Sequence, residues 1–302
     1  MVNKFTPPER IGFVGLGNMG VPMARRLAEA GYQLAVADAN ADAVTRFAAV
    51  VQCEQPSDLK TLGSLCRVVI TMLPEGNAVR QVLMGEAGVT AGLKPDSVLI
   101  DMTSASPVGT RQLVSELTQK NIPLVDAPVS GGVKKAAEGT LSIMAGGEVE
   151  VIERVRGILD VMGKVFLTGA PGSGHAMKSL NNYLSAGTLA LSAEAVIAGT
   201  QFGLDPKVMI DILNASTGRS NSTEHKYPNF ILPRTFDSGF AIGLMAKDLR
   251  LALELAQSTG SPSMLLKDMT EIWNKAEQEL GFRADNTEVV KYLESLVEDK
   301  GD

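Results

Sequence analysis

The pattern of hydrophobic and polar positions divides the chain into two halves. In the first half, short apolar runs alternate with amphipathic stretches. Apolar runs of this length, separated by helical patterns, are typical of parallel strands buried between helices. The pattern predicts strands at 11–15, 34–38, 68–73, 98–101, 122–126, 141–145 and 164–168, and helices at 21–30, 78–84, 108–119 and from about 148.

In the second half strand character disappears after Thr168, where Ala170-Pro-Gly-Ser-Gly174 interrupts the alternation. Helices are predicted at 174–203, 206–215, 242–258, 263–279 and 286–298, with irregular polar loops at 216–222 and 227–240. The fold class is therefore an α/β Rossmann-like N-terminal domain, residues 1–171, followed by an all-α C-terminal domain, residues 172–302. A long interdomain helix joins them. The last four residues are the only expected disordered tail.

Composition narrows the function classes. The chain has 302 residues, enough for about two domains. Its net charge of −6 argues against a nucleic-acid partner, which would require a basic face. No run of roughly 18 apolar residues predicts a membrane helix, and the first ten residues lack a signal peptide's apolar core. Two cysteines and two histidines predict neither a disulfide framework nor a metal site. A cytoplasmic location is expected.

A glycine-rich loop follows the first predicted strand and precedes the first helix. It reads Gly15-Leu16-Gly17-Asn18-Met19-Gly20. In the dinucleotide-binding arrangement, the first glycine permits a tight turn, the second lets the backbone approach a pyrophosphate, and the third allows close helix–strand packing. A glycine turn that binds nothing is the alternative. The flanking strand, the helix and an acid after the second strand favour a nucleotide site.

That acid, Asp38, bears on the choice of cofactor. A carboxylate here accepts hydrogen bonds from a ribose 2′-hydroxyl and repels a 2′-phosphate. The next residues, Ala39-Asn40-Ala41, include no arginine that could hold such a phosphate. NAD is therefore predicted over NADP.

Residues after the later strands are candidates for binding cofactor or substrate, because such loops line the ligand crevice of an open parallel sheet. They are Leu73, Pro74, Thr103 and Ser104. For Ser104 and Ser106, capping of the helix that starts near Pro107 is an equally weighted alternative. The loop Ser130-Gly131-Gly132 also follows a strand, and its N–H groups could form an anion nest.

The predicted long helix carries Lys178, Asn181 and Asn182 at i, i+3 and i+4, so these three side chains share one face. On the helix alone, a solvated face is as good an interpretation as a functional one. The nucleotide site upstream favours function, and places Lys178 and Asn182 at the expected crevice between the domains.

Four separated motifs together make the chain resemble the β-hydroxyacid dehydrogenase family over nearly all its length. The first is the glycine-rich loop Gly15-Leu-Gly-Asn-Met-Gly20. The others are Asp126-Ala-Pro-Val-Ser-Gly-Gly132, Gly172-Ser-Gly-His-Ala-Met-Lys178-Ser-Leu-Asn-Asn182 and Lys247-Asp248-Leu249. The resemblance implies an NAD-dependent oxidoreductase acting on a small carboxylate, and a homodimer or homotetramer. It also implies roles by position: Lys178 as catalytic acid/base, Asn182 on the substrate, Ser130, Gly131 and Gly132 on its carboxylate, and Leu73, Pro74, Ser104 and Lys247 toward the cofactor.

The chemistry agrees with this assignment. Hydride transfer from an alcohol carbon leaves a hydroxyl proton, and a buried lysine whose pKa is lowered by desolvation can accept it. No metal is then required. In 6-phosphogluconate dehydrogenases a glutamate two turns after the catalytic lysine protonates the enediol formed by decarboxylation; here that position is Ser185. Oxidation–reduction without loss of CO₂ is therefore predicted.

Several residues keep two interpretations. Arg219 is a candidate clamp for a substrate anion or one half of a surface ion pair. His175 could face the active site or make a helix-start hydrogen bond, and Lys247 could form a helix-start ion pair with Asp248. His225 has no support beyond the polarity of its loop. Two other functions stay open: imine reduction, which the lysine at position 178 disfavours, and nucleotide binding without catalysis.

Overall fold

The computed structural model describes residues 4–298, which fall into two compact units. The first unit ends at Lys178 and the second begins at Ser179. The long helix α8 (Ser173–Gln201) starts in the first unit and continues into the second. Each unit is described separately.

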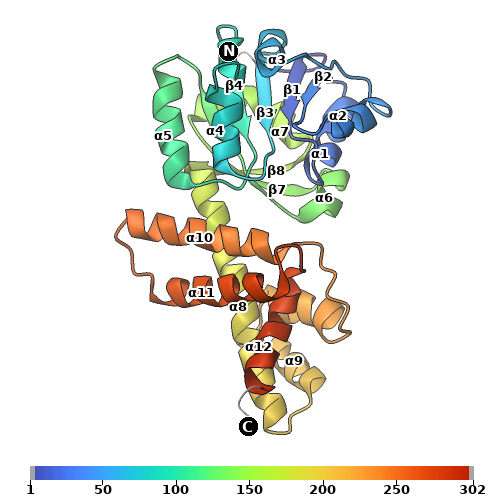
Figure 1. Cartoon of the computed structure of the whole chain (residues 1–302), viewed down its shortest axis with the longest axis vertical. Helices are drawn as coiled ribbons and strands as arrows, with labels where there is room; N and C mark the ends of the chain where they lie inside the picture. The colour runs from blue at the N-terminus through green and yellow to red at the C-terminus, as the bar shows by residue number, and fades with distance from the viewer. Residues whose placement is uncertain (1–3, 299–302) are drawn as a thin grey trace. The chain divides into compact units, whose positions relative to one another are not determined.

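The first unit is a mixed sheet with helices on both faces (Figure 1). The strand order is β2-β1-β3-β4-β5-β7-β6, with β8 paired to β7. The first five strands are parallel, β7 runs antiparallel to β5 and β6, and β8 is parallel to β7. The strands are β1 (Arg10–Val14), β2 (Gln33–Ala37), β3 (Val68–Thr71), β4 (Val98–Asp101), β5 (Leu124–Asp126), β6 (Val129–Ser130), β7 (Leu141–Gly146) and β8 (Gly163–Gly169).

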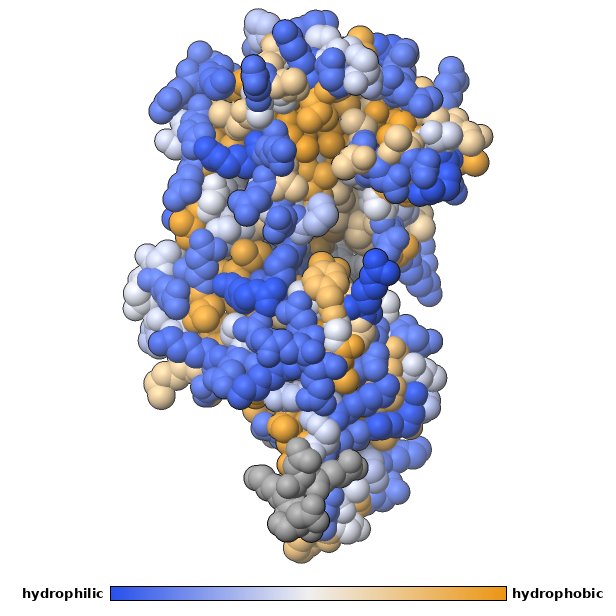
Figure 2. Space-filling view, viewed as in Figure 1, coloured by the Kyte–Doolittle hydropathy of each residue, from blue (hydrophilic) through white to orange (hydrophobic). Residues whose placement is uncertain are grey.

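Two apolar layers, one on each face, bury the sheet. Alternate strand residues point to opposite faces, so Ile70 packs in one layer and its neighbour Val69 in the other. One layer includes residues of α1 (Gly20–Glu29), α2 (Ala41–Ala48), α6 (Gly132–Glu138) and α7 (Val149–Asp160). The other includes residues of α3 (Leu59–Leu65), α4 (Gly76–Met84), η1 (Val89–Ala91) and α5 (Pro107–Thr118). On the face shown in Figure 2, hydrophobic residues gather around these strands and polar residues cover most of the helices.

The Rossmann-like class predicted for the N-terminal half is confirmed, with two differences. The sheet is mixed rather than all parallel, because β7 returns antiparallel beside β5. The segment predicted as a loop at Ala127–Gly132 contains the short strand β6 and leads into α6 at Gly132. A strand of two residues and a helix of seven are too short to produce a readable hydrophobic period.

The second unit is helical. After α8 come α9 (Pro206–Ala215), the π-helix η2 (Ser222–Ile231), α10 (Ile242–Ser258), α11 (Met264–Leu280), η3 (Asn286–Glu288) and α12 (Val289–Glu298). Trp273 on α11 is completely buried in a core that all the longer helices of this unit share. Asp205 caps α9 through a hydrogen bond from Val208 N, with Pro206 in the first turn, as the Asp-Pro signal predicts.

The prediction of an irregular loop beginning at Tyr227 is wrong for its first part, because the π-helix η2 continues to Ile231 and contains Pro228. Apolar side chains on η2, Tyr227 and Ile231, are buried in the helical core. A proline within a polar stretch signals a loop, and only packing against that core reveals the helix. The four C-terminal residues expected to be disordered lie outside the described residues. No helix between residues 4 and 298 is long and apolar enough to cross a membrane.

Candidate active site

The glycine loop has the geometry that a dinucleotide requires. Gly15 adopts φ +105°, and a Cβ there would lie 2.2 Å from Met72 O. A Cβ on Gly20 would lie 1.9 Å from Gly15 O, so only glycine allows α1 to pack this closely on the turn. Beside Gly17, in contrast, an added Cβ would meet no atom within 4 Å. The loop therefore combines two packed glycines with one whose backbone faces open space, as approach by a pyrophosphate requires.

Asp38 lies beside this loop. Its Oδ2 accepts a hydrogen bond from Leu16 N at 2.6 Å, and its Oδ1 accepts one from Asn40 N at 2.8 Å. The carboxylate at the end of β2 is thus fixed against the turn after β1. The chain's own residues fit an adenine dinucleotide at this position, because a hydrogen bond holds the acid against the glycine loop.

The carboxyl ends of β3, β4 and β5 bring three polar residues into register: Thr71 pairs with Asp101, and Asp101 pairs with Asp126. Asp101 Oδ1 accepts hydrogen bonds from Thr71 Oγ1 at 2.8 Å and from Thr103 N at 3.1 Å. Thr103 Oγ1 in turn accepts one from Leu73 N at 3.0 Å. A hydrogen bond therefore connects the loops after β3 and β4, both of which were predicted to bind a ligand. Thr103 is completely buried, and its contact with substrate stays a prediction.

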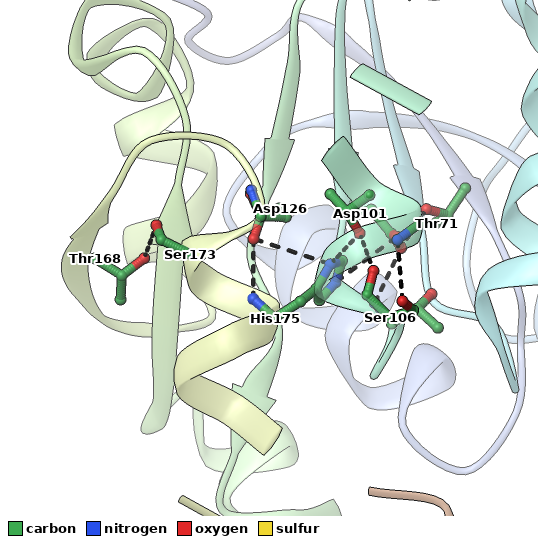
Figure 3. Close-up of polar contacts among 11 residues, drawn as sticks. Thr71, Asp101, Ser106, Asp126, Thr168, Ser173 and His175 are labelled. Atoms are coloured by element: carbon green, nitrogen blue, oxygen red, sulfur yellow. Dashed lines mark hydrogen bonds and ion pairs between the residues drawn. The ribbon is translucent and has the colours of Figure 1, made fainter. Parts of the chain in front are cut away.

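Asp126 connects this strand edge to the start of α8 (Figure 3). Its Oδ1 accepts from Gly172 N at 2.7 Å and its Oδ2 from His175 N at 2.9 Å. Burial raises the pKa of this carboxyl, which the charge of His175 and the two backbone N–H groups oppose. A carboxylate at a helix N-terminus satisfies otherwise unpaired N–H groups and stabilises the helix dipole.

His175 is buried within the same network. Its Nδ1 lies 2.7 Å from Thr110 Oγ1. Its Nε2 lies 3.8 Å from Asp101 Oδ2 (Figure 3). These contacts tie α8 to α5 and β4 one turn before Lys178. The side chain thus adds to the anchoring of α8. Sequence reasoning missed this network, although an acid at the end of a strand was a readable signal in Asp126.

The loop Ser130-Gly131-Gly132 passes from β6 into α6. Gly131 and Gly132 adopt φ values of +138° and +71°, which side chains rarely tolerate. An added Cβ on Gly132 would meet nothing within 4 Å. The backbone is therefore open at Gly132 but not at Gly131, where an added Cβ would lie 2.7 Å from Lys135 Cδ, and anion binding by this loop stays a prediction.

The two residues at the centre of the prediction, Lys178 and Asn182, lie one turn apart on α8. Both are buried, with exposed fractions of 7% and 6%. Asn182 Nδ2 donates to Asp248 Oδ2 at 2.5 Å, and its Oδ1 accepts from Asn181 Nδ2 at 3.0 Å. Within the second unit, therefore, the Lys247-Asp248 motif on α10 contacts α8. The alternative of a fully solvated face is wrong for Lys178 and Asn182.

A second buried lysine, which sequence reasoning missed, lies near this helix face. Lys226 on η2 donates to Ser185 Oγ at 3.4 Å and to Asn286 Oδ1 at 3.1 Å. Burial lowers its pKa to about 8, and the charge of Asp285 opposes that shift. Ser185 is the position where decarboxylating relatives were expected to carry an acid. No local pattern around Lys226 distinguishes it from an ordinary surface lysine.

Other candidates have ordinary structural partners. Ser106 caps α5 through Gly109 N, as its structural alternative predicted. Arg219 pairs with Glu224 at 2.7 Å, with 63% and 44% of the two side chains exposed. His225 lies against Asn229 and Phe230. No cluster of His, Cys, Asp or Glu among residues 4–298 could hold a metal ion.

Comparison with known proteins agrees with this geometry. Residues 10–170 match the model of the NAD-binding domain of 6-phosphogluconate dehydrogenase. Residues 172–293 match the model described as NAD-binding of NADP-dependent 3-hydroxyisobutyrate dehydrogenase. The fold and the glycine loop thus define an NAD(P)-binding oxidoreductase.

Whole-chain relatives identify the family. The chain is 37% identical to 2-(hydroxymethyl)glutarate dehydrogenase of Eubacterium barkeri, with 95% of each chain covered. It is 35% identical to 3-sulfolactaldehyde reductase of Escherichia coli, over 88% of this chain and 89% of that one. The solved structure of 3-hydroxyisobutyrate dehydrogenase of Mycobacterium tuberculosis with L-serine matches with a TM-score of 0.88 and 31% identity. The match covers 94% of this chain and 99% of that one. This chain belongs to the β-hydroxyacid dehydrogenase family.

Proposed function

We propose that the protein interconverts a small β-hydroxyacid and its semialdehyde or ketone by NAD-dependent hydride transfer, with Lys178 as the general acid/base and without decarboxylation. One observation carries the proposal. Lys178 and Asn182 are buried one turn apart on α8, and the start of this helix is anchored to the strand edge through Asp126. A buried lysine so close to an anchored helix start can be held in a single orientation, which acid/base catalysis requires.

Each residue has a defined part in the proposed reaction. NAD held by the glycine loop and Asp38 would supply the acceptor for the hydride of the alcohol carbon. Lys178 Nζ takes the hydroxyl proton during oxidation and returns it during reduction. Asn182, held by Asp248, hydrogen-bonds the substrate. The N–H groups of Ser130, Gly131 and Gly132 bind the carboxylate, and the open backbone at Gly132 favours this contact.

The choice of NAD over NADP rests on Asp38. Its carboxylate is fixed beside the glycine loop, where it would accept a ribose hydroxyl and repel a phosphate. Leu73, Pro74 and Ser104 are proposed to contact the nucleotide, and Lys247 to reach toward it.

The absence of decarboxylation rests on Ser185, whose hydroxyl is not an acid at neutral pH. NADH formation from a β-hydroxyacid should therefore proceed without CO₂ release, which coupled spectrophotometry and CO₂ detection measure together. Release of one CO₂ for each NADH would overturn this part of the proposal.

The decisive variant is Lys178→Ala, assayed with NAD and a panel of β-hydroxyacids. Turnover should fall by about 10²–10⁴-fold, the range contributed by general acid/base catalysis. The Kd for NAD, measured by fluorescence titration, should stay close to that of the wild type. Lys207→Ala, an exposed lysine on α9, is the matched control. Wild-type turnover in Lys178→Ala would disprove the role of Lys178, and nucleotide binding without turnover in the wild type would favour a non-catalytic protein.

Imine reduction is not favoured by any feature of the site. Solved imine reductases are 16–17% identical with TM-scores of 0.59–0.64, which shows a shared fold alone. We also expect a homodimer or homotetramer in the cytoplasm. Light scattering of the purified chain and fractionation of its host test these two expectations.

A further inference from the structure

Lys226 is a buried cation outside the proposed catalytic set. Only 8% of the residue is exposed. Its two hydrogen-bond partners are the neutral oxygens of Ser185 and Asn286. Asn286 is itself fixed, because its Nδ2 donates to Ser238 Oγ and Phe240 O at 2.9 and 2.8 Å. Its Oδ1 is thereby directed at the lysine, and the ammonium is held in place from two sides.

The charge of this ammonium is poorly compensated within the part of the chain that the structure describes. No carboxylate between residues 4 and 298 forms an ion pair with Lys226 Nζ. Asp285 contributes only a longer-range attraction, and its oxygens accept hydrogen bonds from Ser238, Gly239 and Thr287. Burying a charge is costly unless an opposite charge or several hydrogen bonds compensate it. The ammonium has three N–H donors, and neutral acceptors occupy two of them.

The contact with Ser185 places this cation beside the face of α8 that carries Asn182. Ser185 follows Asn182 at i+3 and Lys178 at i+7, so the three side chains share one side of the helix. Seven residues of α-helix rise about 10 Å. Ser185 thus lies about two turns along α8 from Lys178, and Lys226 on η2 contacts α8 at Ser185.

We propose that Lys226, together with Ser185, binds a second anionic group at the far end of the substrate, so that the substrates are dianionic β-hydroxyacids. This inference rests on the proposed function and specifies its substrate class. A terminal carboxylate or sulfonate would take the remaining N–H of Lys226, accept from the Ser185 hydroxyl and supply the missing negative charge. A neutral hydroxyl would leave the ammonium charge uncompensated. Lys226 would therefore be a specificity-determining residue that takes no part in proton or hydride transfer.

The test compares a dianionic and a monoanionic substrate of the same reaction type, 2-(hydroxymethyl)glutarate and 3-hydroxyisobutyrate, each with NAD. Lys226→Met removes the charge and keeps most of the apolar stem. It should lower kcat/KM for the dianion by about 10–100-fold, the range for a charged hydrogen bond, mainly through KM. For the monoanion the change should stay below threefold. Lys207→Met removes an exposed ammonium of the same unit as a control, and should leave both values unchanged.

A binding measurement separates this inference from the proposed function. Calorimetry with glutarate and butyrate, which carry no hydroxyl, should show glutarate binding to the wild type, binding weakened at least tenfold in Lys226→Met, and weaker binding of butyrate to both. Lys226→Gln is the second variant in case the methionine variant does not fold. If the wild type oxidises neither acid yet binds glutarate through Lys226, the proposed function fails and the anion site stands. Equal losses for dianion and monoanion, together with unchanged glutarate binding, would overturn the inference and show that Lys226 is a structural tie.

Discussion

Asp126 in the first unit and Lys226 in the second are both buried and ionisable, but the protein compensates them differently. The carboxylate of Asp126 accepts two backbone N–H groups from the start of α8 and has His175 beside it. Among residues 4–298, the hydrogen-bond acceptors of the Lys226 ammonium are a hydroxyl and an amide oxygen. In both cases burial shifts the pKa against the charged form, upward for Asp126 and downward for Lys226.

The difference separates a structural charge from one suited to a ligand. Backbone N–H groups at a helix start are fixed in place, so Asp126 has its partners whether or not a substrate is present. A lysine with two neutral partners and a remaining donor gains more from an added anion. We therefore interpret Asp126 as an anchor of the helix that carries Lys178, and Lys226 as a recognition group.

The largest effect is expected from breaking the anchor. Asp126→Ala leaves two buried backbone N–H groups without their acceptor, which should lower the free energy of unfolding by about 4 kcal/mol. Urea denaturation followed by circular dichroism measures the loss. Asp160→Ala, at an exposed position on α7, is the control. A loss below about 1 kcal/mol would show that Asp126 does not anchor α8.

The second effect concerns Lys226 and depends on pH. Its folded pKa of about 8 lies below the ordinary value of 10.5, so between these values the unfolded chain binds more protons than the folded one. Stability should therefore rise with pH in this window, by about 3 kcal/mol at most. Lys226→Met should lack this rise. Urea denaturation of both proteins at several pH values between 7.5 and 10 isolates the difference, and parallel profiles would contradict the shift.

A smaller effect is expected at Asp38, a further carboxylate, and concerns the choice of cofactor. Asp38, like Asp126, accepts two backbone N–H groups, but it is only half-buried and next to the proposed nucleotide site. Asp38→Ser should lower the ratio of kcat/KM for NAD to that for NADP by about tenfold or more, because the repulsion of a 2′-phosphate disappears. Steady-state kinetics with both cofactors measures the ratio. An unchanged ratio would remove Asp38 from cofactor selection.

The smallest effect is expected at an exposed pair. Arg219 and Glu224 are solvated, so Arg219→Gln should change the free energy of unfolding by less than about 1 kcal/mol. Urea denaturation checks this value. A larger loss would mean that exposure is a poor guide to the strength of charge pairs in this unit, and would weaken the contrast between buried and exposed groups.

Much of the first unit could be predicted because its signals are local. The glycine loop, the strand before it and the acid after the second strand lie within about 30 residues, the length of one βαβ unit. The helical spacing of Lys178, Asn182 and Ser185 is equally local, because it depends only on an uninterrupted helix. Where the signals were weak, as in β6, the prediction was a loop, and no element was predicted for most of α6. The π-helix η2 was missed because Pro228 and its polar neighbours resemble a turn.

By itself, the sequence determined the alternation of strands and helices, the dinucleotide loop and the order of residues along one face of α8. These features follow from short-range periodicity and from the conformational freedom of glycine. Only the tertiary structure decided that Asp126 anchors α8 and that Lys226 meets Ser185 and Asn286. Asp126 is 46 and 49 positions from its partners Gly172 and His175 in the sequence. Lys226 is 41 and 60 positions from Ser185 and Asn286. Contacts over such separations depend on how whole elements pack, and no local pattern records them.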